Sequence, residues 1–318
     1  MSLLSLLIAL AAEKSLSSSY WRFDFYYQKY ANFFLRENIA DSKAKQSTLK
    51  VTLFLLLPVA IIYTFLSMIG EGALCFVLST LILIVCFGCF TIRSSYKQYL
   101  HAAFRGDETA SKLYHQQLLQ EKNLPDMGFG QALVWLNYRY YIAIILFFVA
   151  FGPAGVVFYR LLTTLIEHEN SCSIDQSKKC ANHESTEQSE QSEQQCNTTE
   201  NNNQNESEKY SIPSVSSGCK NYHDILFYLD WLPVRLTSFG YMFVGHFSKA
   251  MPIWLESLFD VNKPTHNILI DVAEKSEDNM VNENDCTAEP CLLVRLSKRT
   301  VLLLLATVAL LTLFGVIR

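Results

Sequence analysis

The chain has 318 residues, of which half belong to the hydrophobic group and 18% are charged, and its mean hydropathy is positive. Its formal net charge is −4 and it has no dense basic patch, which argues against nucleic acid as a partner. The apolar residues lie in long blocks and lack amphipathic spacing, which favours a membrane protein over a soluble enzyme with buried core helices.

Four of these blocks contain no charged side chain: residues 51–69, 73–92, 140–159 and 301–317. A helix that crosses a bilayer needs about 20 mostly apolar residues, and only helices or closed barrels satisfy their backbone polar groups there. The blocks do not have the length or alternation of barrel strands. We therefore predict an all-α, polytopic membrane protein with four to five membrane helices, amphipathic interfacial helices and a disordered polar insert.

The N-terminal residues 2–12 are apolar and end in Ala9-Leu10-Ala11, which resembles a signal-peptidase site. No Lys or Arg precedes this run, and the segment that follows is rich in both, which favours its retention in the cytoplasm. We expect a retained N-terminal helix. Residues 20–34 interleave aromatic and charged side chains, which predicts either an interfacial amphipathic helix or a soluble helix packed under the bundle.

The acidic turn Ile69-Gly70-Glu71-Gly72 should join 51–69 and 73–92 in a hairpin with its tip outside, because basic residues in 93–139 place that stretch inside. Basic residues also precede the last helix, so the chain between must cross twice or not at all. Residues 151–155 (Phe-Gly-Pro-Ala-Gly) form a place where a helix can break or reverse. Whether 140–166 and 223–259 both span or are both re-entrant stays open.

Polar inserts separate the apolar parts. Residues 169–218 are dominated by Ser, Gln, Asn and Glu, which predicts a disordered linker. The expected divisions are a membrane domain at 1–168, this linker, a broken amphipathic or re-entrant helical segment at 219–260, a polar loop at 261–299 and a membrane helix at 300–318. Cys172, Cys180, Cys196, Cys219, Cys286 and Cys291 lie in the inserts, and whether any of them pair stays open. Cys86-x-x-Cys89 is interpreted as packed thiols.

The sequence contains no phosphate-binding loop, no dinucleotide fingerprint and no His-Glu-x-x-His motif. We therefore expect no cofactor, no metal site and no catalytic residue. What remains is polar groups beside the membrane. In "YLDWLPVRLT" (228–237), Asp230 and Arg235 flank Pro233 inside an apolar run, where each charge alone would cost about 2.5–3.5 kcal/mol.

We predict that Pro233 breaks the helix and that Asp230 and Arg235 turn toward the bundle interior. There they would meet two other polar clusters in one cytoplasmic-side pocket for a charged head group. The pocket residues are Arg105, Asp107, Glu108, Thr109, Asn137, Arg139, Asp230 and Arg235. The alternative is that these residues are snorkelling charges and helix caps that only fix depth in the membrane.

Long stretches resemble the AmpE family of inner-membrane proteins, named for a link to induction of chromosomal β-lactamase. They are "YLHAAFRGDETASKLYHQQL", "QALVWLNYRYYIAIILFFVAFGPAGVVFYRLL" and "YLDWLPVRLTSFGYMFVGHFSKAMPIWLESL". The resemblance covers most of the chain except the polar inserts. It implies a multi-pass protein of the bacterial inner (plasma) membrane that modulates β-lactamase induction and the cell-wall stress response. Its partners would be the lipid bilayer, a muropeptide or lipid-linked ligand and a membrane or cell-wall-recycling protein.

The AmpE family in turn resembles the adenosylcobinamide-phosphate synthase family, membrane enzymes that join an aminopropanol arm to the corrin ring. "DWLPVRLT" is similar to "W-I-P-A-R-L-T" of that family, and "GDET" to "G-R-D-T". However, Trp135 and Arg139 occupy the two acidic positions of "A-E-N-L-V-D-G", and "D-R-L-x-G-D-P" is reduced to Glu13-Lys14. These departures favour a non-catalytic modulator. The alternative is a membrane ligase or transferase that acts on an anionic amphiphile.

Overall fold

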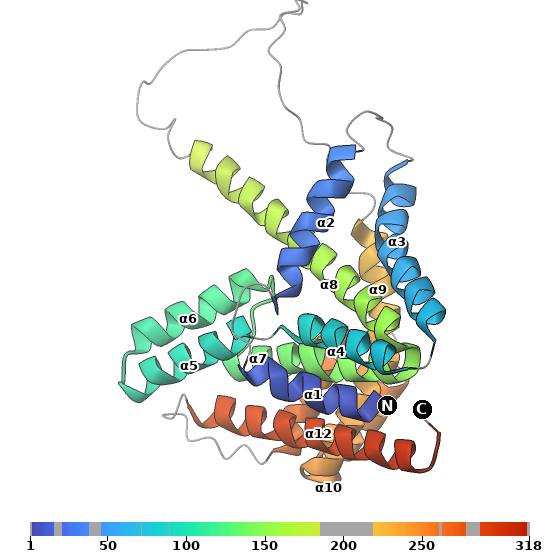
Figure 1. Cartoon of the computed structure of the whole chain (residues 1–318). Helices are drawn as coiled ribbons and strands as arrows, with labels where there is room; N and C mark the ends of the chain where they lie inside the picture. The colour runs from blue at the N-terminus through green and yellow to red at the C-terminus, as the bar shows by residue number, and fades with distance from the viewer. Residues whose placement is uncertain are drawn as a thin grey trace, which may run out of the picture.

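The computed structural model describes residues 2–15, 21–37, 46–70, 72–88, 90–184, 219–260, 263–277 and 287–316, and these form helices and turns without a strand (Figure 1). The elements are α1 (Ser2–Ser15), α2 (Phe23–Glu37), α3 (Gln46–Ile69), α4 (Ala73–Phe87), α5 (Phe90–Phe104), α6 (Glu108–Glu121), α7 (Phe129–Asn137), the π-helical turn η2 (Tyr138–Ile142), α8 (Ala143–Glu184), α9 (Cys219–Val244), α10 (Phe247–Leu258), α11 (Thr265–Ser276) and α12 (Ala288–Leu313). The predicted all-α class is confirmed.

Four helical stretches are long and apolar enough to cross a membrane, judged by length and composition: Val51–Ile69, Ala73–Phe104, Phe129–Glu167 and Ala288–Leu313. Large apolar side chains of α3, such as Ile61, Phe65 and Met68, are exposed on the protein surface. Such exposure is unfavourable in water but suits contact with lipid. The prediction of a polytopic helical membrane protein is confirmed.

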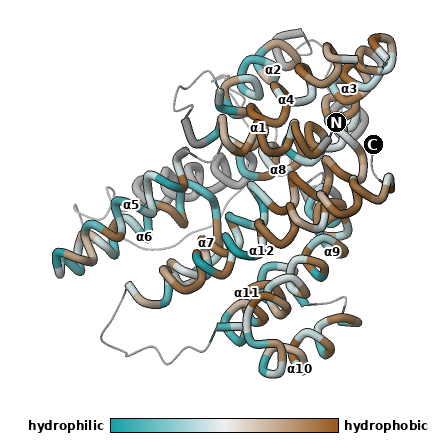
Figure 2. The backbone as a smooth tube through the Cα atoms, turned by 60° about the horizontal axis from the view of Figure 1, so that its bottom comes forward, coloured by the Kyte–Doolittle hydropathy of each residue, from teal (hydrophilic) through white to brown (hydrophobic). Residues whose placement is uncertain are grey.

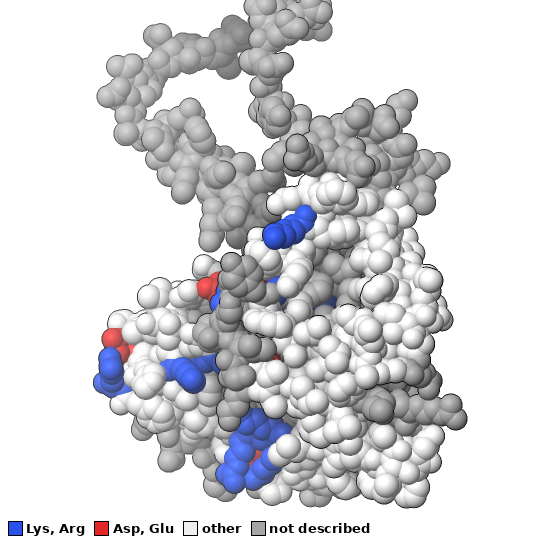
Figure 3. Space-filling view, in the orientation of Figure 1, with Lys and Arg blue, Asp and Glu red and all other residues white. Residues whose placement is uncertain are grey.

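Apolar and charged surfaces lie on different parts of the molecule. In the tube view, brown apolar segments run along α1, α3, α4 and α12, whereas α5 and α6 are largely teal (Figure 2). In the space-filling view, the visible charged side chains lie mainly over the α5–α6 hairpin and the beginning of α12, and the opposite end of the bundle shows none (Figure 3). The α5–α6 hairpin therefore belongs to the polar end of the molecule.

The N-terminal helices are tied to the bundle by polar contacts as well as packing. Glu13 at the end of α1 forms an ion pair with Arg93 (2.9 Å between Oε1 and Nη2) and accepts a hydrogen bond from the Tyr141 hydroxyl at 3.1 Å. In α2, the Tyr30 hydroxyl donates to the carbonyl oxygen of Phe54 at 3.0 Å. Helix α1 also packs along α4, so these first helices are integral parts of the fold.

Helix α8 reverses direction at Gly152, whose φ of 70° and ψ of −164° are non-helical. Pro153 follows, and a residue before proline disfavours the helical region. The two arms of α8 run back along each other: the Phe147 and Tyr159 rings stack with centroids 4.6 Å apart, and the Tyr140 hydroxyl bonds to Glu167 beyond the turn. Residues 140–166 thus form a helical hairpin whose two ends meet on one side of the bundle.

Helix α9 corrects one prediction. It continues without interruption through Pro233, so the predicted break there is wrong. The Thr237 and Ser238 hydroxyls bond back to carbonyl oxygens one turn earlier, at 2.7 and 2.8 Å, and the helix packs against α8, α11 and α12. The chain instead turns at Gly245 and His246, between α9 and α10.

Two segments expected to be irregular contain helix. Residues 169–184 continue α8, and the rest of the predicted disordered linker, 185–218, lies outside the described residues. The predicted polar loop 261–299 contains α11 and the first turns of α12. Helix α11 buries Ile268, Leu269, Val272 and Ala273 on one face. Cys75, Cys86 and Cys291 are free thiols, and pairing among the other insert cysteines falls outside the described side chains.

The hairpin turn allows a direct test of its backbone. A Cβ built at Gly152 meets nothing within 4 Å, so Gly152→Ala adds backbone strain without a steric clash. We expect it to lower the free energy of unfolding by about 1–3 kcal/mol. Thermal unfolding in detergent would measure this. Gly72→Ala is the matched control, since Gly72 is extended (φ −154°) with equally open space, and it should change stability by less than about 1 kcal/mol. Equal effects of the two substitutions would contradict this account.

Candidate functional site

A network of buried charges joins the two ends of the α8 hairpin. Glu167 on the second arm pairs with Lys122 (3.7 Å, Nζ to Oε2) and with Arg139 of η2 (3.6 Å, Nη1 to Oε1). The Lys122 ammonium also donates to the Tyr140 hydroxyl at 2.6 Å, and that hydroxyl donates to both carboxylate oxygens of Glu167 at 3.2–3.3 Å. The side chains of the three charged residues are only 10–13% exposed. We call Lys122, Arg139, Tyr140 and Glu167 the Glu167 network.

The turn after α6 positions Lys122. Asn123 adopts a positive φ of 48°, a conformation that Asn tolerates better than most residues, and its side-chain amide donates to the Glu167 carbonyl oxygen at 2.8 Å. The backbone of the turn is thereby fixed to the end of the hairpin. Burial alone would lower the pKa of Lys122, but the facing Tyr140 and Glu167 raise it overall, so the ammonium stays charged.

Asp230 extends these contacts to α9. Its carboxylate is 2% exposed and accepts hydrogen bonds from the hydroxyls of Tyr138 (2.7 Å) and Tyr159 (3.0 Å). Burial raises the pKa of Asp230, while Arg139 and the two hydroxyls act in the opposite direction. Tyr138 lies between Asn137 and Arg139 in the sequence. Its hydrogen bond to Asp230 therefore brings Asp230 close to the predicted Asn137–Arg139 cluster.

Arg160 is a buried charge that the sequence analysis did not include. It lies on the second arm of α8, is 2% exposed, and its guanidinium lies over the rings of Tyr140 (4.4 Å) and Phe23 (5.3 Å). Its Nε and Nη1 atoms have no hydrogen-bond partner among the described residues. The sequence signal was a single arginine in the apolar arm 153–166. Lys122 and Glu167 were also missed, because each lies in or beside a stretch that is polar for other reasons.

Arg235 has a different role from Asp230. Its guanidinium donates to the carbonyl oxygens of Leu258 (2.8 Å), Ser257 (3.2 Å) and Asp260 (2.6 Å) and lies over the Trp231 ring at 4.2 Å. These bonds satisfy the end of α10, which is a common use of a basic side chain. No ion pair joins Asp230 and Arg235, and the two side chains have different partners, so the structure does not bring Arg235 into a pocket shared with Asp230.

The predicted cluster at 105–109 lies at the exposed tip of the α5–α6 hairpin, which projects from the bundle (Figure 1). Asp107 caps α6, accepting from the Ala110 amide at 3.0 Å and the Thr109 hydroxyl at 2.7 Å, and these bonds lower its pKa. Glu108 pairs with Lys112 at 3.6 Å, and Arg105 is exposed. These residues fit the alternative of caps and surface charges, and the structure does not bring them to Asp230 or Arg139.

Asn137, at the end of α7, is half-buried, and its Oδ1 atom is buried without a hydrogen-bond partner in the described part of the chain. Of the eight predicted pocket residues, the structure thus gathers Asn137, Arg139 and Asp230 around η2. It adds Lys122, Tyr138, Tyr140, Tyr159, Arg160 and Glu167 to that region.

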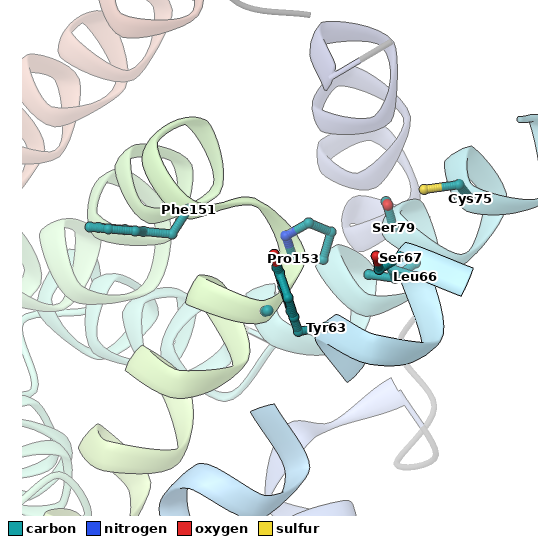
Figure 4. Close-up of a pocket in the computed structure, with 8 residues that line it drawn as sticks. Tyr63, Leu66, Ser67, Cys75, Ser79, Phe151 and Pro153 are labelled. Atoms are coloured by element: carbon teal, nitrogen blue, oxygen red, sulfur yellow. The ribbon is translucent and has the colours of Figure 1, made fainter. Parts of the chain in front are cut away.

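A separate cavity of about 310 Å³ lies at the other end of the hairpin, beside the Gly152 turn. Side chains from α3, α4 and the α8 turn line it (Figure 4). They are Tyr63, Leu66, Ser67, Cys75, Ser79, Phe151, Pro153 and Ala154. The lining is mostly apolar and holds no charged group, so this cavity does not share the chemistry of the Glu167 network.

A family model described as regulatory signalling modulator protein AmpE matches residues 1–173 and 210–318. The chain belongs to the AmpE family. Protein AmpE of Shigella flexneri is 25% identical to this AmpE-family chain over 248 residues, which cover 74% of the chain and 72% of the relative. No solved structure matches. The resemblance seen in the sequence is confirmed, and with it the coarse assignment as a regulatory membrane protein.

The match to the AmpE family includes every member of the Glu167 network as well as Asp230 and Arg160, since these residues lie within the matched ranges. The unmatched stretch, 174–209, lies in the polar insert and the last turns of α8. The buried charges therefore belong to the part of the chain that defines its family membership.

The separate contacts of Asp230 and Arg235 in this AmpE-family chain predict additive effects. Because the two side chains share no partner, the losses of stability in Asp230→Asn and Arg235→Ala should add within about 0.5 kcal/mol in the double variant. Tyr138→Phe with Asp230→Ala should instead show a coupling of about 0.5–3 kcal/mol, because each removes the same hydrogen bond. Chemical unfolding in detergent measures both cycles. Strong coupling in the first pair would contradict the separate contacts of the two side chains.

His266 on α11 predicts a pH dependence. Its ring packs edge-on against Trp135 (5.9 Å between centroids), and burial, followed by the field of Arg139, lowers its pKa. The neutral imidazole therefore stabilises the fold fully above about pH 6.5, and this contribution is lost as pH falls through the folded-state pKa. Between about pH 7.5 and pH 5.5, Tm should fall further for wild type than for His266→Gln. Parallel Tm curves for the two proteins would show that His266 has no such role.

Proposed function

We propose that this chain is a non-catalytic modulator in the bacterial inner membrane that acts in β-lactamase induction and the cell-wall stress response. The observation that supports it is the Glu167 network, together with AmpE-family membership. Ionisable groups buried among membrane helices are costly to maintain and usually mark functional positions. Here they connect the turn after α6, the hairpin and, through Tyr138 and Asp230, helix α9.

The network would face the cytoplasm. The stretch 93–139 carries the basic residues that favour the cytoplasmic side, and Lys122 and Arg139 belong to it. The hairpin returns Glu167 to the same end, so a cytoplasmic muropeptide, a lipid-linked ligand or a protein partner would meet the network there. We propose that such a ligand competes for the partners of Glu167.

Such competition offers a physical route to signalling. A ligand shifts a conformational equilibrium only by binding one state better than the other. If it takes Arg139 or Lys122 from Glu167, the contact between the α6–α7 turn and the hairpin end weakens, and the neighbouring Tyr138–Asp230 bond to α9 is free to respond. The exposed α5–α6 hairpin would then present the change to a partner.

The test is an induction assay in a strain whose own gene is replaced by variants. Glu167→Gln removes the shared charge, and we expect it to change expression of a β-lactamase reporter roughly twofold or more under a β-lactam. Asp271→Asn is the control, because Asp271 on α11 is a surface acid with one ion pair, to Lys263, and it should behave as wild type. Immunoblots would confirm equal protein levels, and Tyr140→Phe gives a milder change to the same network if Glu167→Gln does not accumulate.

A deletion strain separates the modulator from the ligase or transferase alternative. Altered induction with unchanged lipid and muropeptide profiles would support the modulator. A newly accumulating anionic amphiphile would favour the enzyme, and normal induction in both the deletion and the Glu167→Gln strains would reject the proposed role.

A further inference from the structure

Arg160 is a buried cation, and two of its three side-chain nitrogen atoms have no hydrogen-bond partner among the described residues. The residue is 2% exposed, and its Nε and Nη1 atoms are buried without a partner in the described ranges. A guanidinium has five N–H donors and no acceptor, and buried donors of this kind are almost always satisfied. The guanidinium lies over the ring faces of Tyr140 and Phe23, and this cation–π contact stabilises its charge. The rings do not accept hydrogen bonds from the N–H groups that lie in the guanidinium plane.

The nearby carboxylates are already engaged. Glu167 is shared by Lys122, Arg139 and Tyr140, and Asp230 accepts from two tyrosine hydroxyls. Asp24 on α2 is half-buried and interacts with Arg160 through its field, but no ion pair joins them. Among the described residues, no ion pair gives Arg160 the close carboxylate that a buried arginine ordinarily has.

Other unused polar atoms lie around Arg160. Thr164 follows it by one turn on the same face of α8, is 1% exposed, and its Oγ1 atom has no partner among the residues described. Arg139, which borders the same Tyr140 and Glu167, is also buried, and its Nε atom donates to nothing in the described structure. The unused groups are thus mainly donors, and they come from η2 and the second arm of α8.

We propose that Arg160, with Thr164 and Arg139, binds a phosphate group that enters at the cytoplasmic end of the α8 hairpin. Unpartnered arginine donors on two elements, with an unpartnered hydroxyl one turn from Arg160, match an acceptor that offers oxygens in several directions. Lys122 and Glu167, each 13% exposed, lie at the edge of the site, where entry is possible. The phosphate is either a free anion or the head group of a lipid.

This inference deepens the proposed function and rests on it only for the ligand's role in the cell. A bound phosphate would be a second anion beside Arg139, so it would compete with Glu167 for that guanidinium. Binding in a purified sample and induction in cells are separate measurements. Failure of one can therefore be told from failure of the other.

The experiment uses the full chain purified in detergent, with Tm followed while sodium phosphate replaces sodium chloride at constant ionic strength. A second arm compares nanodiscs of phosphatidylcholine alone with nanodiscs that also contain phosphatidylglycerol. We expect Tm to rise by about 3 °C or more in at least one arm, since a ligand that binds only the folded state stabilises it. A rise with free phosphate identifies a small anion, and a rise only with phosphatidylglycerol identifies the phosphate of an anionic lipid head group, because the phosphate of phosphatidylcholine is already paired with its choline cation.

The variant Arg160→Gln should abolish this rise. Without the probe, its Tm should equal or exceed that of wild type, because the substitution removes a buried charge with unused donors. Arg299→Gln is the control, since Arg299 is an exposed arginine on α12 near the same end of the bundle, and it should retain the full rise. If Arg160→Gln does not fold, Thr164→Val is measured in the same way and should reduce the rise by at least half.

The proposal fails if neither arm raises the Tm of the wild-type protein. It also fails if Arg160→Gln, or Thr164→Val in its place, retains the wild-type rise. A rise that Arg299→Gln abolishes instead would assign the effect to surface charge beside the lipid head groups. That outcome would also reject a site at Arg160.

Discussion

The structure depends on the neutralisation of one buried carboxylate, that of Glu167. An acid with 13% of its side chain exposed, at the end of an apolar arm, needs partners, and removing a partner from such a pair typically costs about 3–5 kcal/mol. The partners of Glu167 are Lys122, Arg139 and Tyr140, which all precede the Gly152 turn in the sequence. They can reach Glu167 only because α8 reverses at Gly152. The turn at one end of the hairpin and the charges at the other are therefore parts of one arrangement.

The two charges of "DWLPVRLT" show how helix geometry separates neighbouring residues. In a continuous helix, positions five residues apart face directions about 140° apart, so Asp230 and Arg235 cannot point at each other. Because Pro233 leaves α9 intact, the acid turns toward Tyr138 and Tyr159, while the base turns toward the end of α10. One motif thus links α9 to the hairpin on one face and to α10 on another.

What the sequence predicted well was local. Apolar length identified the spans, and Gly152-Pro153 indicated a reversal, because each signal lies within one segment. The partners of Glu167 could not be found in this way, since Lys122 is 45 positions away and the acid lies beside the polar insert. Helix α11 was missed because its apolar residues, at 268–270 and 272–273, are few and lie between polar stretches. The prediction that residues 105–109 join the shared pocket is wrong, because the same polar residue types serve as helix caps and as ligand-binding groups.

The distribution of used and unused polar atoms bears on which function fits. An enzyme that joins an amine to a carboxylate needs acids available for metal or proton chemistry, yet Glu167 and Asp230 are occupied by tyrosines and basic side chains. Around η2 and the second arm of α8, the unpartnered atoms found among the described residues are the Oδ1 atom of Asn137, donors of Arg139 and Arg160, and the hydroxyl of Thr164. A site with spare donors recognises an anion more readily than it activates a nucleophile. This supports a protein that binds its ligand and changes conformation over one that transforms it.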